Sequence, residues 1–321
     1  MTAKCRELTA AKTAEFLEGR DNFVILTHAS PDGDTIGSGY ALMRMLHQKG
    51  KKAAVLLSDY MPKKYDYMNC DSTLDFEPQT VVAVDVADTV LLDGVCKKYE
   101  KIDLCIDHHP SNVRYAERLF LEADASACCE CIYHLAAEMS VDITKDIAND
   151  LYTGIVTDSG CFKFGSTSAE THRIAACLIE KGAEYAEINR RMFETNSKAR
   201  LAIEQAALST ISYHFDGKCA VMCITNDMIK ASGCVNEDLD GIASIPRTVE
   251  GVSVGVTVIE KKKGIFKASF RTHKPSNAAR MAGALGGGGH FCAASCRMRG
   301  DIEDVKNRVL EVVKSELESA E

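Results

Sequence analysis

The chain has 321 residues, of which 46% are hydrophobic and 26% are charged, and its formal net charge is −8. This length suggests about two domains, and the composition is typical of a soluble globular protein. Because no run of about 18 apolar residues occurs and the N-terminus is mixed and charged, we expect neither a membrane span nor a signal peptide.

The first half of the chain alternates short apolar runs with amphipathic ones. Short, continuously apolar strands that alternate with helices favour a parallel sheet covered on both faces. We therefore predict an α/β domain with a parallel sheet over residues 1–190. Its strands are expected at 23–26, 53–57, 81–84 and 102–106, and its helices at 38–48, 126–139, 147–156 and 169–181.

The second half has a different pattern. A strand is expected at 218–225, and the runs 252–260 and 265–272 flank the turn Lys261-Lys262-Lys263-Gly264, which predicts a β-hairpin. A charged amphipathic helix is expected from Asp301 onward. Polar residues interrupt the apolar pattern over 191–206, which we take as a linker. We thus predict a smaller α/β domain over 207–321.

A local excess of basic residues marks the second domain. Residues 260–299 hold nine lysines and arginines against one acid, Glu260. Such a local basic surface suits a small anionic ligand better than a long nucleic-acid duplex, which needs a larger basic face. The three adjacent lysines also fit a solvated hairpin turn with no ligand.

The cysteines indicate a reducing compartment. The chain has 14 of them, and several fall inside apolar runs, where a free thiol acts as a small hydrophobic side chain. Because no signal sequence is evident, we predict free thiols and a cytoplasmic protein.

Four short segments rich in aspartate and histidine follow apolar runs of the first domain. A carboxylate at the end of an apolar strand is costly to bury unless it is paired or bound to a metal. Open parallel sheets place their ligand crevices at the strands' carboxyl ends. The segments are His28-Ala29-Ser30-Pro31-Asp32-Gly33-Asp34, Val84-Asp85-Val86-Ala87-Asp88, Asp107-His108-His109 and Thr157-Asp158-Ser159-Gly160.

Together the four segments favour a metal centre. Alone, the first also fits an acidic turn that leads into a helix with Asp34 as its N-cap. Mixed aspartate and histidine ligands without cysteine suit Mn²⁺ or Mg²⁺ better than structural zinc. The set holds more carboxylates and imidazoles than one ion needs, and a bridging carboxylate would let it hold two. Two ions about 3.5–4 Å apart can activate a water and clamp a phosphate.

The order of these residues resembles a known family. The set His28-x-x-x-Asp32-x-Asp34, Asp85, Asp107-His108-His109 and Asp158 closely resembles the motifs of the DHH superfamily of phosphoesterases. Gly286-Gly287-Gly288-Gly289-His290 resembles the glycine-rich motif of the C-terminal domain associated with that superfamily. The resemblance covers essentially the whole chain, and it implies an active site in the cleft between the two domains. Within the superfamily the chain looks like the stand-alone nanoRNase/pAp-phosphatase group.

The resemblance implies roles for residues in both domains. Two divalent ions are implied, most simply Mn²⁺, with Mg²⁺ or Co²⁺ as alternatives. Asp107 would orient the ligands, His108 would face the scissile phosphate, and Asp85 would bridge the ions. The implied ligands of the first ion are His28, Asp32 and Asp85, and those of the second are Asp34, Asp85, His109 and Asp158. The implied substrate contacts are Arg271, His290 and the backbone N–H groups of Gly286, Gly287, Gly288 and Gly289, with Lys274 and Asn277 as weaker candidates.

The implied activity is hydrolysis of short oligoribonucleotides to mononucleotides, and of 3′-phosphoadenosine 5′-phosphate (pAp) to AMP, by two-metal activation of water. The partner would be short RNA or a small nucleotide, with no membrane and no long duplex, and a homodimer is an open alternative. Two other functions are kept open. One is a cyclic-dinucleotide phosphodiesterase of the same superfamily acting on c-di-AMP, and the other is a non-catalytic nucleotide-binding protein.

Overall fold

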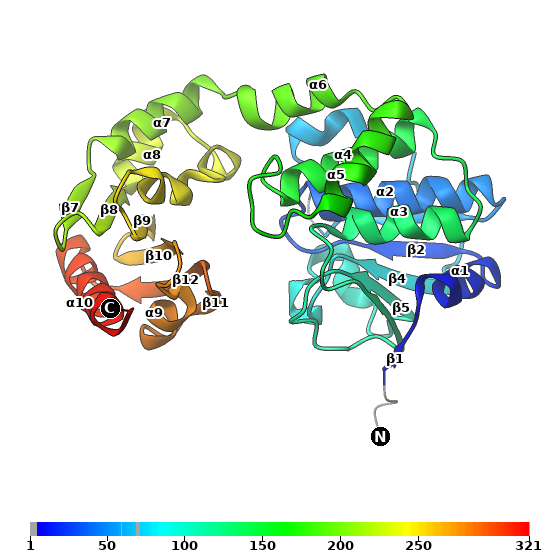
Figure 1. The fold of residues 1–321 in the computed structure, drawn as a ribbon, viewed down its shortest axis with the longest axis horizontal. Helices are drawn as coiled ribbons and strands as arrows, with labels where there is room; N and C mark the ends of the chain where they lie inside the picture. The colour runs from blue at the N-terminus through cyan, green and yellow to red at the C-terminus, as the bar shows by residue number, and fades with distance from the viewer. Residues whose placement is uncertain (1–4, 59, 69–70, 321) are drawn as a thin grey trace. The chain divides into compact units, whose positions relative to one another are not determined.

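The computed structural model describes residues 5–58, 60–68 and 71–320. Its contacts divide the chain into two compact units, Met1–Thr195 and Asn196–Glu321 (Figure 1). The division falls inside the predicted linker, but most of that segment is helical, with a π-helical turn at Arg190–Glu194 and helix α7 at Lys198–Leu208. No helix within the described ranges is both long and apolar enough to cross a membrane.

A six-stranded parallel sheet forms the centre of the first unit. Its strand order is β1-β6-β5-β4-β2-β3, so the four apolar runs predicted as strands are adjacent. The predicted α/β class with a parallel sheet is therefore confirmed. The strands are β1 Arg6–Glu7, β2 Phe23–Leu26, β3 Ala53–Leu56, β4 Thr80–Val84, β5 Leu104–Asp107 and β6 Arg118–Leu121.

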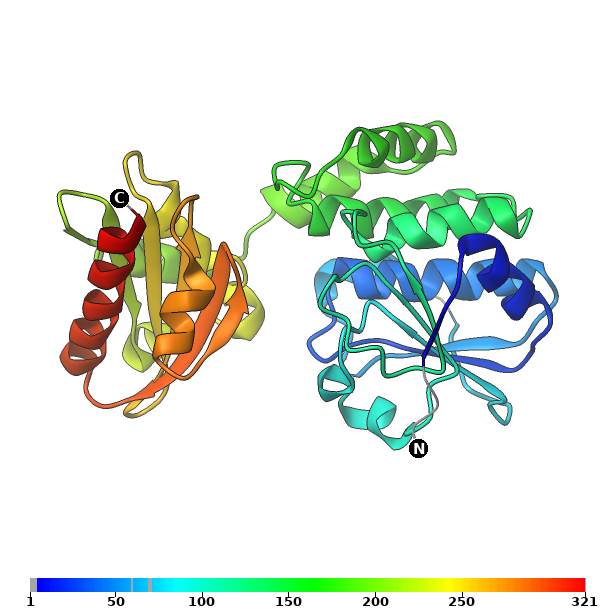
Figure 2. The same cartoon turned by 60° about the horizontal axis from the view of Figure 1, so that its bottom comes forward.

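The two faces of this sheet are covered differently (Figures 1 and 2). One face, which includes Ile25 and Val84, packs against the long helices in the main hydrophobic core. The other face, which includes Leu26 and Ala83, packs against the segment around Val86, where the chain forms only short 3-10 helices. The helical elements are α1 Ala10–Glu18, α2 Gly33–Gln48, η1 Lys63–Met68, η2 Thr89–Leu91, η3 Gly94–Lys98, α3 Cys128–Glu138, α4 Lys145–Asp158, α5 Ala169–Glu180, α6 Tyr185–Asn189 and η4 Arg190–Glu194.

The second unit is built on a mixed six-stranded sheet in the order β11-β12-β10-β9-β8-β7. Strands β8 and β9 are parallel and all other neighbours are antiparallel, including the predicted hairpin of β9 and β10. The strands are β7 Ser212–His214, β8 Cys219–Ile224, β9 Val254–Lys262, β10 Ile265–Thr272, β11 Gly288–His290 and β12 Ala293–Arg299.

Helical elements pack on both faces of this sheet. On the first face, α9 and α10 pack over side chains such as Val256 and Phe270. On the second face, α7 and η6 pack over β8 and β9, through Met222 and Ile259. The remaining helical elements are α8 Asn226–Ser232, η5 Asn236–Leu239, η6 Ile242–Thr248, α9 Ala278–Ala284 and α10 Ile302–Ala320.

Candidate metal centre

The four predicted segments meet at the carboxyl ends of β2, β4 and β5, which are neighbours in the sheet. His28 follows β2, Asp85 follows β4, and Asp107 ends β5. Two helices complete the site, since α2 begins just after Asp32 and α4 ends at Asp158. The strand ends and these two helices thus bring together residues that lie up to 130 positions apart, from His28 to Asp158.

The first group of ligand atoms comes from His28, Asp32 and Asp85. Nδ1 of His28 lies 2.9 Å from the carbonyl oxygen of Ala29, to which it donates, and this leaves Nε2 to face the carboxylates. Nε2 lies 3.6 Å from Asp32 Oδ1 and 3.4 Å from Asp85 Oδ2. Burial lowers the pKa of His28, but the two carboxylates outweigh it and raise the pKa to about 11.

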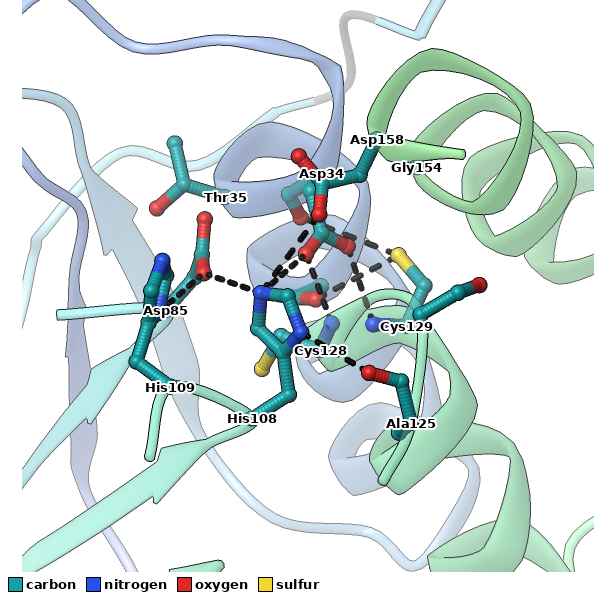
Figure 3. A network of polar contacts seen from close by, with 12 residues as sticks. Asp34, Thr35, Asp85, His108, His109, Ala125, Cys128, Cys129, Gly154 and Asp158 are labelled. Atoms are coloured by element: carbon teal, nitrogen blue, oxygen red, sulfur yellow. Dashed lines mark hydrogen bonds and ion pairs between the residues drawn. The ribbon is translucent and has the colours of Figure 1, made fainter. Parts of the chain in front are cut away.

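The second group comes from Asp34, His108 and Asp158 (Figure 3). Nδ1 of His108 is 3.1 Å from the carbonyl oxygen of Ala125, so Nε2 again faces carboxylates. It lies 3.8 Å from Asp34 Oδ2, 3.5 Å from Asp158 Oδ2 and 3.5 Å from Asp85 Oδ1. Asp85 therefore touches both groups, with one carboxylate oxygen toward each.

The two histidines of the Asp107-His108-His109 segment take different positions from those that the sequence suggests. Both lie near Asp85 and form a third group with it. Nε2 of His108, expected to face the phosphate, lies among three carboxylates, whereas Nδ1 of His109 lies 2.8 Å from Asp107 Oδ1 and 3.5 Å from Asp85 Oδ1. The His109 side chain is also the more exposed, at 32% against 11%. The geometry therefore favours His108 over His109 as the ligand beside Asp34 and Asp158.

Asp107 holds both histidines in place. Its buried Oδ1 accepts hydrogen bonds from the backbone N–H of His108 (2.8 Å), from the backbone N–H of His109 (3.2 Å) and from Nδ1 of His109 (2.8 Å). Its Oδ2 accepts from Nδ2 of Asn112 at 2.6 Å. Burial raises the pKa of Asp107, but the His109 and Asn112 donors outweigh it and lower the pKa. A carboxylate with these bonds can orient a neighbouring ligand without binding metal.

Asp34 connects the site to helix α3. Its carboxylate accepts hydrogen bonds from the backbone N–H groups of Cys128 (2.6 Å) and Cys129 (2.9 Å), at a helix start where the N-cap side chain makes no bond. The N-cap of α2 is Asp32, whose Oδ1 accepts from Asp34 N–H, so the alternative with Asp34 as N-cap is wrong. Burial first, and then Asp85 and Asp158, raise the pKa of Asp34 well above its ordinary value.

The site fits divalent cations. Asp85 Oδ1 and His108 Nε2 are buried and have no hydrogen-bond partner among the described residues, although they lie only 3.5 Å apart. Buried polar atoms without partners are rare in proteins and often mark an ion. The main chain is also strained here, because φ of Asp85 is 58°, a value that non-glycine residues seldom adopt. Oxygen and imidazole donors without thiolate suit a divalent ion such as Mn²⁺ or Mg²⁺.

Metal binding near pH 7 should release protons. At that pH a metal-free protein would hold protons on His28 and His108, since the pKa of each is raised to about 11, and a ligand must lose its proton to bind. Burial also raises the pKa of Asp158 to about 7. Because protons compete with the ion, the affinity for Mn²⁺ should fall as the pH decreases. Calorimetric titrations in buffers of different ionisation enthalpy measure the release, and a heat independent of buffer would contradict it.

Gly154 of α4 has no side chain, and this lets Asp34 and the start of α3 pack closely against α4. A Cβ at this position would overlap Cys129 Sγ and lie 2.7 Å from Asp34 Oδ1. We expect Gly154→Ala to lower the free energy of unfolding by about 1–3 kcal/mol through overpacking, and to weaken Mn²⁺ binding by displacing Asp34. Thermal unfolding and metal titration measure the two effects. The control is Gly165→Ala, where an added Cβ meets nothing within 4 Å. Equal behaviour of the two variants would contradict the prediction.

The predicted substrate residues lie in the second unit. Arg271 is in β10 and His290 ends β11, whereas exposed Lys274 lies between β10 and α9. Asn277 differs from expectation, because its Oδ1 caps α9 by accepting from Arg280 N–H at 3.2 Å and its own N–H donates to Glu316 Oε1 at 2.8 Å. Its side chain thus has a structural role.

The four glycines have separate structural roles. A Cβ on Gly287 would overlap the carbonyl oxygen of Ser295, and one on Gly289 would lie 2.6 Å from that of Ala293, so β11 presses closely on β12. Gly286 has φ of 77°, which favours glycine. A Cβ on Gly288 meets nothing within 4 Å. Backbone conformation and close packing against β12 therefore explain the glycines at 286, 287 and 289 without a ligand.

Two residues near the predicted sites carry no sequence motif. Asn112 holds Asp107, and Arg247 of η6 places its Nη1 3.5 Å from the carbonyl oxygen of Thr272. Burial, and then the charge of Arg247, lower the pKa of Arg271, so the two guanidinium groups are close. Asn112 lies only five positions after Asp107, and this proximity is the one signal that could have indicated it.

Comparisons with known proteins cover both units. Residues 22–155 match the model of the DHH family, N-terminal domain, and residues 216–319 match the model of the DHHA1 domain. A curated relative from Thermus thermophilus, the bifunctional oligoribonuclease and PAP phosphatase NrnA, is 34% identical over 92% of this chain and 90% of its own. The enzyme of the same name from Bacillus subtilis is 23% identical over 85% of this chain and 88% of its own.

Among solved structures, an exopolyphosphatase-related protein from Bacteroides fragilis has the same fold. Its TM-score is 0.86, with 24% identity, over 97% of this chain and 96% of that one. At this identity the likeness concerns the fold. Because it covers 97% of this chain, it extends through both units.

Proposed function

This chain belongs to the DHH family of phosphoesterases, and from that membership we propose that it hydrolyses short oligoribonucleotides to mononucleotides and pAp to AMP with the aid of two Mn²⁺ ions. The observation that carries the proposal is the pair of ligand groups joined by Asp85, in a chain 34% identical over 92% of its length to a relative with that named activity. Short RNA or a small nucleotide, rather than a long duplex, is the proposed substrate class.

The proposed ligands follow the geometry. His28, Asp32 and Asp85 would hold one ion, and Asp34, Asp85, His108 and Asp158 the other. Such a pair of ions lowers the pKa of a water and neutralises phosphate charge. The unpartnered oxygen of Asp85, 3.5 Å from His108 Nε2, supports its role as the bridge.

His109 is proposed to contact the scissile phosphate. Because its Nδ1 donates to Asp107, its Nε2 is left for the substrate. Burial lowers the pKa of His109, but Asp107 and Asp85 outweigh it and raise the pKa, so the ring carries a proton at neutral pH more readily than free histidine. A protonated ring would donate to a phosphoryl oxygen and stabilise the charge that develops there.

The second unit is proposed to bind the substrate's end. The guanidinium of Arg271 offers paired donors for a phosphate, and it stays charged in spite of its burial. His290 and the N–H groups of the glycine motif would approach the same group. Lys274 is a weaker candidate, and Asn277 is no longer proposed because its side chain caps α9.

The test is a side-by-side assay of the Mn²⁺-loaded protein on pApA, a five-nucleotide RNA, pAp and c-di-AMP. We expect release of mononucleotides from the two linear RNAs and of AMP from pAp. Turnover of c-di-AMP alone would favour the cyclic-dinucleotide alternative. Absence of turnover on every substrate with Mn²⁺, Mg²⁺ and Co²⁺ would refute the proposal and favour a non-catalytic nucleotide-binding protein.

A further inference from the structure

The second unit has a row of small residues around Arg271. Residues that pair directly across antiparallel strands carry their side chains on the same face. Arg271 pairs with Gly255 on β9 and with Ala293 on β12, and Ala293 pairs in turn with His290 on β11. The guanidinium therefore stands between a glycine and an alanine, with the imidazole one strand further along. The small side chain of Ala293 leaves room for a ligand on the β12 side of Arg271.

Element η6 closes one end of this row. A Cβ on Gly255 would lie 2.5 Å from the backbone nitrogen of Arg247, so η6 crosses the sheet directly over the glycine. A ligand at Arg271 is thus blocked on the β9 side by the backbone of η6. A ligand that extends beyond Arg271 must therefore run along β12 and toward the start of β10.

Polar and basic side chains continue along β10 and β12 on the same face. Two residues before Arg271, Ser269 pairs with Ser295, and two residues earlier again, Lys267 pairs with Arg297. Ser269 is buried, Ser295 is half-buried, and Lys267 and Arg297 are exposed. We call Lys267, Ser295 and Arg297 the basic strip. The alternate residues on β10, Ala268 and Phe270, point to the opposite face and belong to the core beneath α9 and α10.

The basic strip has no acidic partner. Among the residues that the structure describes, none forms an ion pair with Lys267, Arg297 or Arg271. Burial, and then the positive charges of Lys261, Arg271 and Arg297, lower the pKa of Lys267. The one nearby acid in the sequence, Glu260, accepts from the backbone N–H of Asn226 at 3.0 Å. Like charges gathered without acids favour a polyanionic ligand.

The spacing of the strip suits a chain of phosphates. Residues two apart on a strand are separated by roughly 6.5–7 Å, so Lys267 lies about 13 Å along β10 from Arg271. A single phosphate bound at Arg271 does not reach Lys267. The backbone of an extended oligonucleotide does, and the hydroxyl of Ser295 between them can donate a hydrogen bond to it.

We propose that Lys267 and Arg297 form a second phosphate subsite, which binds the backbone of an oligonucleotide beyond the nucleotides held at Arg271. The inference rests on the proposed function, because it presumes that the terminal phosphate or nucleotide lies at Arg271. The subsite makes affinity depend on substrate length. Oligonucleotides of about four or more residues reach both positions along the strand, whereas pApA and pAp reach only the first.

The test is the double variant Lys267→Gln/Arg297→Gln of the full-length, Mn²⁺-loaded protein. Binding is measured by fluorescence anisotropy with a five-nucleotide RNA and with pApA, both linked by phosphorothioates so that they resist hydrolysis. We expect the five-nucleotide RNA to bind about tenfold more weakly, because two charged groups are removed, and pApA to change less than twofold. The slope of log affinity against log salt for the longer RNA should become shallower by about 1.4, since each phosphate that is no longer neutralised accounts for about 0.7.

The matched control is Lys262→Gln/Lys263→Gln, which removes the same charge at the adjacent hairpin turn and should leave both affinities within twofold of wild type. Unchanged binding of the five-nucleotide RNA to the strip variant would overturn the subsite. Equal weakening of the five-nucleotide RNA and pApA would also overturn it, and so would equal weakening by the strip variant and the control variant. In either case the overall positive charge of the domain, and not a local subsite, would explain the effect. These outcomes concern binding, whereas failure of the proposed function is read separately from turnover of unmodified substrates.

Discussion

Replacing Asp85 by alanine should reduce kcat on pApA by at least about a thousandfold. The carboxylate lies 3.4 Å from His28 Nε2 and 3.5 Å from His108 Nε2, so its loss removes a ligand from both proposed ions at once. In two-metal sites the ions supply most of the stabilisation of the phosphoryl transition state. Turnover and the bound Mn²⁺ per protein, measured on the same sample, should fall together.

Two further variants sharpen this prediction. Asp88→Ala removes an acid from the same segment whose side chain accepts from Val90 N–H outside the site, and it should keep normal activity. Arg271→Ala should mainly raise KM, because the contact proposed for it is to a part of the substrate remote from the bond that breaks. Thermal unfolding of metal-free Asp85→Ala should show an intact fold, since the repulsion that it removes with Asp34 and Asp158 offsets the ion pairs that it removes with His28 and His108. Near-normal turnover of Asp85→Ala would refute the bridging role.

Replacing His108 and replacing His109 by asparagine should affect metal binding differently. His108→Asn is expected to lose Mn²⁺ at the second position and at least about a hundredfold in kcat, because its Nε2 faces Asp34, Asp85 and Asp158. His109→Asn is expected to keep both ions and lose about a hundredfold in kcat, as for removal of a single transition-state donor.

The distinguishing measurement is the Mn²⁺ content by calorimetric titration, with kcat as a second readout. Asn112→Ala serves as an intermediate case, since it frees Asp107 Oδ2 and should loosen His109 without removing any ligand. If His109→Asn, and not His108→Asn, lost metal, the roles that the sequence resemblance implies would be right and the exchange proposed from the geometry wrong.

The parallel sheet is predictable from sequence because its central strands carry an unambiguous signal. Strands β2, β4 and β5 are buried on both faces and therefore form short runs of mainly apolar residues, with Thr80 at the start of β4 and Asp107 at the end of β5. Strand β6 begins with an arginine, and β1 spans only two residues at the sheet edge, so neither forms such a run. The same pattern identifies which residues meet at the strand ends. It carries no information on the rotation of each side chain, and so it cannot distinguish the roles of His108 and His109.

In the second unit the local signals are weaker. The hairpin of β9 and β10 is predictable because a lysine and glycine turn separates two apolar runs. Strands β11 and β12 escape prediction because glycines and small residues have low strand propensity, and their pairing is fixed by close backbone approach at Gly287 and Gly289. Arg247 comes close to Arg271 through tertiary packing of η6, which no spacing in the sequence could indicate.

Asp34 contacts both the start of α3 and a group of metal-ligand atoms, and this has a consequence for relatives that lose activity during evolution. Its carboxylate holds the start of α3 through Cys128 and Cys129 as well as facing the ligand groups. A descendant that no longer needed catalysis would therefore still be under selection to keep Asp34 for folding, while Asp158, at the end of α4 and 37% exposed, could drift. In a newly sequenced relative, the presence of an aspartate at the position of Asp34 is weak evidence of an active enzyme, and the presence of partners equivalent to His108 and Asp158 is stronger.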